Sequence, residues 1–308
     1  MSLKEIKTKT LCWLNIANAD EKEIDCLRQR YNFHPLDLED CFKTGQRPKI
    51  EKYSDYLFLV LLFPIYNKAT REIEPEEIDF FIGKDFFVTV HDNRLPPLCE
   101  LNELCQLNDQ AREKYLKKPA LLLYEILNKL LSHCYPMLDH LSIDIRNVEK
   151  QIFNGQAKKI IQDVLIIRRN ITDFRKIMQA HKNTLKKLSD IIKQNGYLDS
   201  EKTNIYYGSL VEQTKEIWDH LESYKESIEA LQKTHESLIS FRLNDIMKNF
   251  TTISVIIFSM TLVATTFGIG AKNTPFVHHP WAFWIIAAVL IVVASSMWQF
   301  FKTKKWLQ

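Results

Sequence analysis

Two long apolar runs close to the C-terminal end dominate the hydrophobic pattern of the chain. The first covers residues 250–271 and the second covers residues 281–301, and neither run contains a charged residue. A helix needs about 20 apolar residues to cross a bilayer. The pattern therefore predicts two transmembrane helices joined by a short loop, residues 272–280, so that both ends of the chain lie on one side of the membrane.

The charges beside these runs predict which side that is. Lys302, Lys304 and Lys305 follow the second run, and Arg242 and Lys248 precede the first. Because lysine and arginine accumulate on the cytoplasmic side of membrane helices, we expect both termini in the cytoplasm. The loop between the runs is then outside.

One face of the first run differs from the others. Steps of three and four residues pick out side chains that are small or polar with two exceptions, whereas the other faces carry mostly Ile, Val, Leu and Phe. Hydroxyl side chains in a membrane helix face protein or water rather than lipid. This face, called the seam below, is either a helix-packing surface whose hydroxyls bond back to carbonyls, or the wall of a pore. It consists of Asn244, Met247, Thr251, Ser254, Phe258, Thr261, Thr265 and Gly268.

Short apolar runs and turn signals dominate the first 118 residues, and they predict a layered α/β/α domain. The acids from Asp20 onward indicate a helix reaching Tyr31, and Pro35 suits the start of another. Pro64 is expected to end a central strand, because proline cannot donate a ladder hydrogen bond. The predicted strands cover residues 11–16, 56–63, 78–82 and 86–90.

From Pro119 onward the apolar spacing becomes helical. Residues 121–153 and 160–192 predict two helices, and a third runs from about residue 204 into the first membrane span. At 1.5 Å per residue this third helix is on the order of 100 Å long, so it must project as a stalk. The predicted parts are a cytoplasmic α/β domain (1–118), a helical hairpin (119–203), the stalk (204–249), the first span (250–271), the external loop (272–280), the second span (281–301) and a basic tail (302–308).

Composition excludes several classes of function. The 308 residues carry a net charge of only +3, so no nucleic-acid partner is expected. Six cysteines without a Cys-x-x-Cys pair indicate free thiols. His34, His91, His278 and His279 lie near no serine or cysteine in a nucleophile setting, so the sequence does not predict an enzyme.

Several blocks of the chain stand out together: the residues at 33–40, 46–51, 81–91 and 244–248, with Phe250, Thr251, Thr261, Gly268, Pro275 and the end of the chain at 304–307. These blocks resemble the CorA family of divalent-cation channels. The resemblance implies a funnel-shaped homopentamer in the plasma (inner) membrane, with lipid and a metal cation as partners. It also implies that the first span lines the pore, that Mg²⁺ or another divalent cation is the transported ion, and that no organic cofactor is bound.

The chain departs from this family at its ion filter. The family has Gly-Met-Asn at the end of the first span, whereas this chain has Gly268, Ile269 and Gly270. Five copies would still offer rings of backbone carbonyls, which can select ions, but they would lack the ring of side-chain amides. The resemblance thus implies a filter at these three residues with weaker selection for Mg²⁺.

A second departure concerns regulation by metal. Asp37, Glu39 and Asp40 lie near a predicted helix start, where acids either favour the helix dipole or bind a cation. In the family, the position of Asp40 is one half of an inter-subunit Mg²⁺ sensor, and Glu39 resembles part of a weaker site. The partner position on the stalk is Ser209 here, which brings no charge. We expect a weakened, absent or rewired sensor.

Two functions from different classes remain open. One is a CorA-like channel in which Thr261 forms a hydroxyl ring, Asn244 an amide ring, and Phe258 and Met247 apolar constrictions. Mg²⁺ dehydrates reluctantly, so such a pore must pass the ion with water attached. The other is a CorA-shaped membrane scaffold or regulatory subunit that does not conduct. A transporter for another divalent ion, such as zinc or cobalt, is a further alternative.

Overall fold

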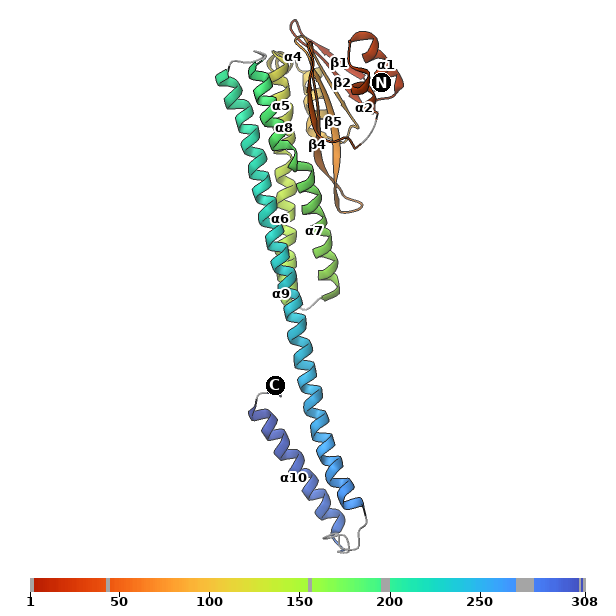
Figure 1. Cartoon of the computed structure of the whole chain (residues 1–308), viewed down its shortest axis with the longest axis vertical. Helices are drawn as coiled ribbons and strands as arrows, with labels where there is room; N and C mark the ends of the chain where they lie inside the picture. The colour runs from red at the N-terminus through yellow and green to blue at the C-terminus, as the bar shows by residue number, and fades with distance from the viewer. Residues whose placement is uncertain are drawn as a thin grey trace. The chain divides into compact units, whose positions relative to one another are not determined.

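A computed structural model describes residues 3–42, 45–154, 157–194, 200–269, 280–304 and 306. The chain divides into two compact units, residues 1–231 and 232–308. The first unit holds a sheet with helices on both faces and the second holds two apolar helical segments (Figure 1). The long helix α9 (Ser200–Gly268) contributes to both units.

The first unit is built on a six-stranded sheet with the order β1-β2-β6-β5-β4-β3. The pairing of β2 with β6 is parallel, and the other pairings are antiparallel. The predicted strands are confirmed, whereas the sequence analysis missed the two edge strands, β1 and β3. The strands are β1 (Leu3–Lys7), β2 (Cys12–Ala17), β3 (Lys49–Lys52), β4 (Leu57–Asn67), β5 (Glu72–Ile82) and β6 (Phe86–His91).

The prediction that Pro64 ends a strand was wrong. Pro64 lies inside β4, directly opposite Pro75 in β5. At these positions β4 and β5 extend beyond the strands on their outer sides. The strand β3 pairs only with residues 57–60 of β4, and β6 pairs only with residues 78–82 of β5. Neither proline is therefore asked to donate to a further strand, which is the condition under which a sheet tolerates proline.

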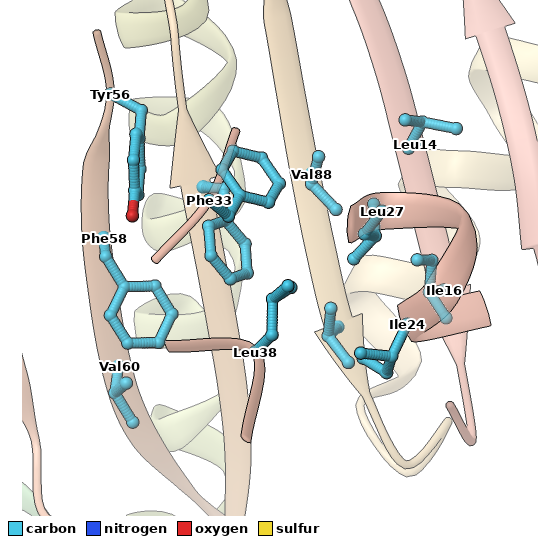
Figure 2. Packing of buried hydrophobic residues seen from close by; sticks show 12 residues of the cluster. Leu14, Ile16, Ile24, Leu27, Phe33, Leu38, Tyr56, Phe58, Val60 and Val88 are labelled. Carbon is cyan, nitrogen blue, oxygen red and sulfur yellow. The ribbon is translucent and has the colours of Figure 1, made fainter. Parts of the chain in front are cut away.

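Two short helices cover one face of the sheet. In α1 (Glu21–Arg30), Asp20 caps the first turn by accepting from the backbone of Lys22 and Glu23. The helix α2 (Pro35–Asp40) has proline at its start, as expected. Figure 2 shows the apolar layer between these helices and the strands, which includes Leu14, Ile16, Ile24, Leu27, Phe33, Leu38, Tyr56, Phe58, Val60 and Val88.

Longer helices cover the opposite face, where Trp13, Phe80 and Phe87 are fully buried. His181 donates from Nε2 to the carbonyl of Leu62 in β4 at 2.6 Å, which ties the helical layer to the sheet. The predicted α/β/α layering is confirmed. The helices that follow the sheet in the chain are α3 (Pro96–Leu107), α4 (Asp109–Tyr115), α5 (Pro119–Ser132), α6 (Cys134–Asn154), α7 (Ala157–Gln179) and α8 (His181–Gln194).

Both helices predicted after residue 120 are split in two. The first breaks at His133, three residues before Pro136, and the second breaks at Ala180. Proline is tolerated in a first helical turn, where its missing N–H has no partner to lose. Pro136 therefore fixes the start of α6 rather than interrupting a longer helix.

The predicted long helix is confirmed, and it begins at Ser200 rather than near residue 204. Within the first unit its apolar stripe is buried at Leu210, Ile217, Leu221 and Ile228. Tyr207 is also fully buried and donates to the Ala120 carbonyl at 2.6 Å. The last helix, α10 (Ala282–Thr303), coincides with the second apolar run.

Candidate ion-conduction pathway

The second unit contains two helical segments that are long and apolar enough to cross a membrane. They are the C-terminal part of α9, which ends at Gly268, and α10. Their apolar side chains remain largely exposed within the chain, with Phe258 at 77% and Phe283 at 74%. In a segment of this composition, exposed apolar surface is suited to lipid or to other copies of the chain.

Each of these helices has one partly covered stripe. In α10 the half-buried positions recur at three- and four-residue steps and end at Phe301, which is buried. In α9 the covered face is formed by Thr252, Ile256, Ser259, Met260, Val263 and Phe267, and Thr252 is completely buried. Matching stripes on neighbouring helices are the pattern of a packed helical hairpin.

The seam lies on the side of α9 opposite this covered face. At 3.6 residues per turn, positions such as Phe258, Thr261 and Thr265 fall about half a turn away from Ile256, Val263 and their neighbours. All of the seam is exposed within the chain except Ser254, which is half-buried. The exposed positions are Asn244, Met247, Thr251, Phe258, Thr261, Thr265 and Gly268.

The seam threonines are bonded to their own helix. The Thr261 hydroxyl donates to the Ile257 carbonyl at 2.8 Å, and the Thr265 hydroxyl donates to the Thr261 carbonyl at 2.9 Å. This is the local bonding expected for threonine in a membrane helix. A hydroxyl that has used its proton still offers acceptor lone pairs. Both threonines can therefore accept hydrogen bonds from the water molecules around a cation.

Two of the three predicted filter residues lie in the described part of the chain. Gly268 is the last residue of α9, and Ile269 follows it with 75% of its surface exposed. A Cβ atom placed on Gly268 would meet nothing within 4 Å among the described residues, so none of their contacts requires glycine there. Gly270 and the loop that follows it, up to residue 279, lie outside the described residues.

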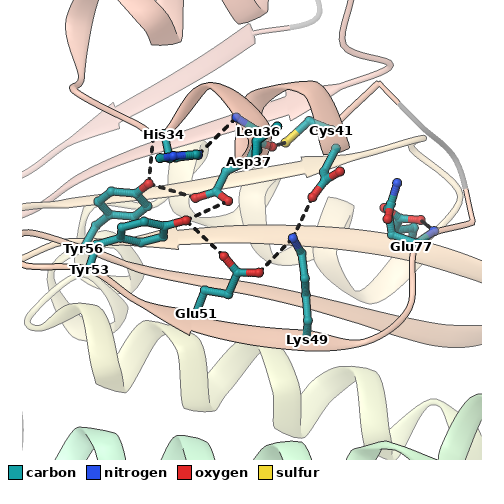
Figure 3. Close-up of polar contacts among 11 residues, drawn as sticks. His34, Leu36, Asp37, Cys41, Lys49, Glu51, Tyr53, Tyr56 and Glu77 are labelled. Atoms are coloured by element: carbon teal, nitrogen blue, oxygen red, sulfur yellow. Dashed lines mark hydrogen bonds and ion pairs between the residues drawn. The ribbon is translucent and has the colours of Figure 1, made fainter.

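The three acids predicted near the start of α2 have different environments. Asp37 is buried, and it accepts from the hydroxyl of Tyr56 at 2.8 Å and from that of Tyr53 at 3.1 Å (Figure 3). Burial raises the pKa of Asp37 although both hydroxyls stabilise its charge. Asp37 thus serves the fold by linking α2 to the segment between β3 and β4. Glu39, in contrast, is exposed.

Asp40, the predicted sensor residue, is already paired with a cation. Lys49 in β3 contacts its carboxylate at 2.6 Å and also contacts Glu51 at 3.1 Å, the second pair being visible in Figure 3. This lysine was not predicted to contact the acid, although it falls in one of the family-like blocks. In the sequence this pair appears only as a basic residue nine positions after an acid, and that spacing does not by itself predict a contact.

The stalk position opposite this acid in the family offers no charge, and its side chain is also engaged. The Ser209 hydroxyl donates to the Tyr206 carbonyl at 2.7 Å. Further along α9, Glu212 and Glu216 are exposed, and Glu216 accepts from the hydroxyl of Tyr135 at 2.8 Å. Within the described ranges, no group of three or more His, Cys, Asp or Glu side chains is arranged to hold a metal ion.

Comparison with known proteins gives a consistent result over almost the whole chain. The family model described as "CorA-like Mg2+ transporter protein" matches residues 8–304. The cobalt/magnesium transport protein CorA of Thermotoga maritima is 25% identical over 301 residues, which are 97% of this chain and 84% of that protein.

Solved structures share the fold. The complete structure of the CorA magnesium transporter from Methanocaldococcus jannaschii superposes with a TM-score of 0.84 at 19% identity, covering 99% of this chain and 95% of that one. The full-length CmaX protein superposes with a TM-score of 0.74 at 16% identity, covering 96% and 89% of the two chains. The similarity therefore includes the α/β domain, the long helix and both apolar helices.

Proposed function

The chain belongs to the CorA family of Mg²⁺ transporter proteins, and we propose that it conducts divalent cations through a pore lined by the seam of α9. The predicted function, a transporter of magnesium or another divalent cation, is confirmed by the family. The prediction that the chain is not an enzyme is confirmed on the same ground, because members of this family transport ions.

The observation that carries the pore proposal is the division of α9 into two faces. The face toward Ile256 and Val263 is covered within the chain, whereas the face with Thr261 and Thr265 is exposed. Hydroxyls are costly against lipid, so an exposed hydroxyl face calls for water or for protein from other copies. A ring of copies, which the family resemblance predicts to be a homopentamer, places this face around a central pathway.

The proposed mechanism follows from the hydration of the ion. Mg²⁺ holds its water tightly, so the pore has to contact the water shell rather than strip it. Thr261 and Thr265 offer acceptor lone pairs beyond their bonds to helix carbonyls. Phe258 and Met247 supply apolar constrictions that close the pathway by dewetting. The polar ring at the other end of the seam is formed by Asn244.

The filter is proposed to select Mg²⁺ weakly. Gly268, Ile269 and Gly270 provide carbonyls but no side-chain amide. Gly270→Asn is expected to raise selectivity for Mg²⁺ and to introduce or strengthen block by cobalt hexammine, which has the size of hydrated Mg²⁺. Tight block of the unmodified protein by that complex would show that carbonyls suffice and that the missing amide is irrelevant.

The experiment that tests the function is a flux assay on the full-length protein in liposomes. Mg²⁺, Co²⁺, Ni²⁺, Zn²⁺ and K⁺ are compared, and we expect flux of several divalent cations with little discrimination. Flux of Zn²⁺ alone would favour the alternative of a zinc transporter. Absence of flux for all five ions, in protein that is folded and assembled, would favour the scaffold or regulatory subunit.

The orientation in the membrane is proposed from the basic flanks. Arg242 and Lys248 precede the first span, and Lys302 and Lys304 follow the second. These flanks place both termini in the cytoplasm. A protease added outside intact cells should then cut only within residues 272–280, and cleavage anywhere in residues 119–248 would contradict the orientation.

A further inference from the structure

A cavity of about 630 Å³ lies in the first unit at the C-terminal ends of the parallel strands β2 and β6. Asn18 directly follows β2, and Asn93 and Arg94 follow β6, and all three line the cavity. Ligands of α/β proteins bind preferentially at the carboxyl ends of parallel strands. None of the seam residues and none of the acids discussed above contributes to this cavity.

Asn15, which is buried in β2, lines the cavity and is held by hydrogen bonds from two neighbouring side chains. His91 accepts at Nδ1 from the backbone N–H of Asn93 at 3.0 Å, so its proton is on Nε2, which donates to Asn15 Oδ1 at 3.1 Å. The Thr89 hydroxyl donates to the same oxygen at 2.6 Å. The carbonyl oxygen of Asn15 is therefore fully used, and its amino group is the part left for the cavity.

A second buried amide in the lining has an unused donor. Asn102 in α3 is 1% exposed, and its Oδ1 accepts from Gln106 Nε2 at 3.1 Å. Its Nδ2 has no hydrogen-bond partner in the described structure. Buried polar groups are nearly always paired, so a donor left open in a cavity wall marks the place of an acceptor group.

Lys4 is the positive charge in the lining that is left for an anionic ligand. It lines the cavity from β1, is exposed, and forms no ion pair with any described residue. Arg94 adds little positive charge, because Glu74 at 2.6 Å and the buried Glu76 at 3.5 Å already pair with its guanidinium. Glu103 is the one acid in the lining. The helix α3 contributes only its dipole, because its first two residues are prolines without an N–H group.

We propose that this cavity binds a small phosphate ester with a hydroxyl-rich group, such as a sugar phosphate. Lys4 neutralises the phosphate, and the amino groups of Asn15 and Asn102 donate to its oxygens or to those of the sugar. Glu103 accepts from the sugar hydroxyls. The volume lies within the range of about 300–1,000 Å³ that small-molecule sites occupy.

The test measures binding of ribose 5-phosphate to the full-length protein in detergent by equilibrium dialysis, with ribose and inorganic phosphate as reference ligands. We expect the ester to bind more tightly than either reference. Lys4→Gln should weaken binding roughly tenfold, the effect of losing a hydrogen-bonded charge. Lys9→Gln removes the same charge from an exposed residue outside the cavity and should leave binding unchanged.

Two further variants test the roles of Asn102 and Glu103 in binding. Asn102→Leu should weaken binding of the ester. Because Asn102 is buried, this variant could also misfold, whereas Lys4→Gln changes an exposed residue and tests the same site without disturbing the core. Glu103→Gln should leave binding of the phosphate group intact or strengthen it, because it removes a negative charge. Three results would each overturn the proposal. The first is no binding of the ester, and the second is an equal effect of Lys4→Gln and Lys9→Gln. The third is loss of binding in Glu103→Gln together with retention of binding in Lys4→Gln. Cation flux does not enter this test, so its result is independent of the pore proposal.

Discussion

The sheet of the first unit and the helices of the second solve the burial of apolar side chains in different ways. In the sheet, Trp13 and Phe80 are completely buried by other parts of the same chain. In the membrane helices, Phe258 and Phe283 keep about three quarters of their surface exposed. The α/β domain therefore buries its apolar core within one chain, whereas the helical pair leaves apolar surface that is suited to lipid or to other copies of the chain.

Polar groups show the same contrast. In the sheet, Asn15, Thr89 and His91 satisfy one another inside the domain. In α9, the seam threonines find partners only in their own helix and keep their acceptor side exposed. We therefore expect ion conduction to depend on the exposed faces of the membrane helices, and stability to depend on the buried core of the α/β domain.

The largest expected effect comes from removing an aromatic ring in each region. Phe80→Ala should destabilise the protein by about 3–5 kcal/mol, because it opens a cavity in a packed core. Phe258→Ala should change stability by less than about 0.5 kcal/mol, because the ring is exposed within the chain. Thermal denaturation of the full-length protein in detergent measures both, and similar losses would erase the distinction between the two regions.

An intermediate effect is expected from acid. His181 is completely buried, and burial lowers its pKa from 6.5 to about 4. Above pH 6.5 the ring is neutral in both states. Between pH 6.5 and 4 the unfolded chain binds a proton on His181 that the folded chain does not bind, so this residue alone should lower stability by about 1.4 kcal/mol per pH unit. The corresponding measurement is thermal denaturation across this pH range.

The control for this effect is His181→Gln, which removes the titrating ring. Its stability at pH 7 should be lower, because the packing against β4 is disturbed, but its slope between pH 6.5 and 4 should be shallower. An unchanged slope would mean that acid sensitivity arises from other groups, including His91, whose pKa is also lowered to about 4 by burial.

The smallest effect is expected at the proposed sensor position. Asp40 is occupied by Lys49, and Ser209 carries no charge, so Mg²⁺ should hardly protect the stalk of the unmodified protein from limited proteolysis. Ser209→Asp should introduce protection by Mg²⁺, since it supplies a second hard oxygen ligand. Ser227→Asp, at an exposed position of the same helix, should not. Strong protection before any substitution would place the regulatory ligands elsewhere.

The sequence predicted the features that depend on local patterns. Run length identified both membrane helices, and periodicity identified α9 and its seam. Pro64 was misinterpreted, because its tolerance depends on where neighbouring strands end, which is set by the pairing of distant residues. The contact between Asp40 and Lys49 was missed for a similar reason, since it requires α2 to lie on β3. Gly270, the residue on which the filter prediction depends most, lies outside the described residues.

The central claim, that the two faces of α9 have different surroundings, is tested most directly by thiol labelling of the transporting protein. Thr261→Cys and Ile256→Cys are reconstituted in liposomes, treated with a positively charged, membrane-impermeant thiol reagent, and assayed for Mg²⁺ flux. The account predicts that Thr261→Cys loses most of its flux on treatment, while Ile256→Cys and the unmodified protein, with its native cysteines, keep theirs. Equal inhibition of both variants, or labelling that spares Thr261→Cys in a conducting protein, would contradict it.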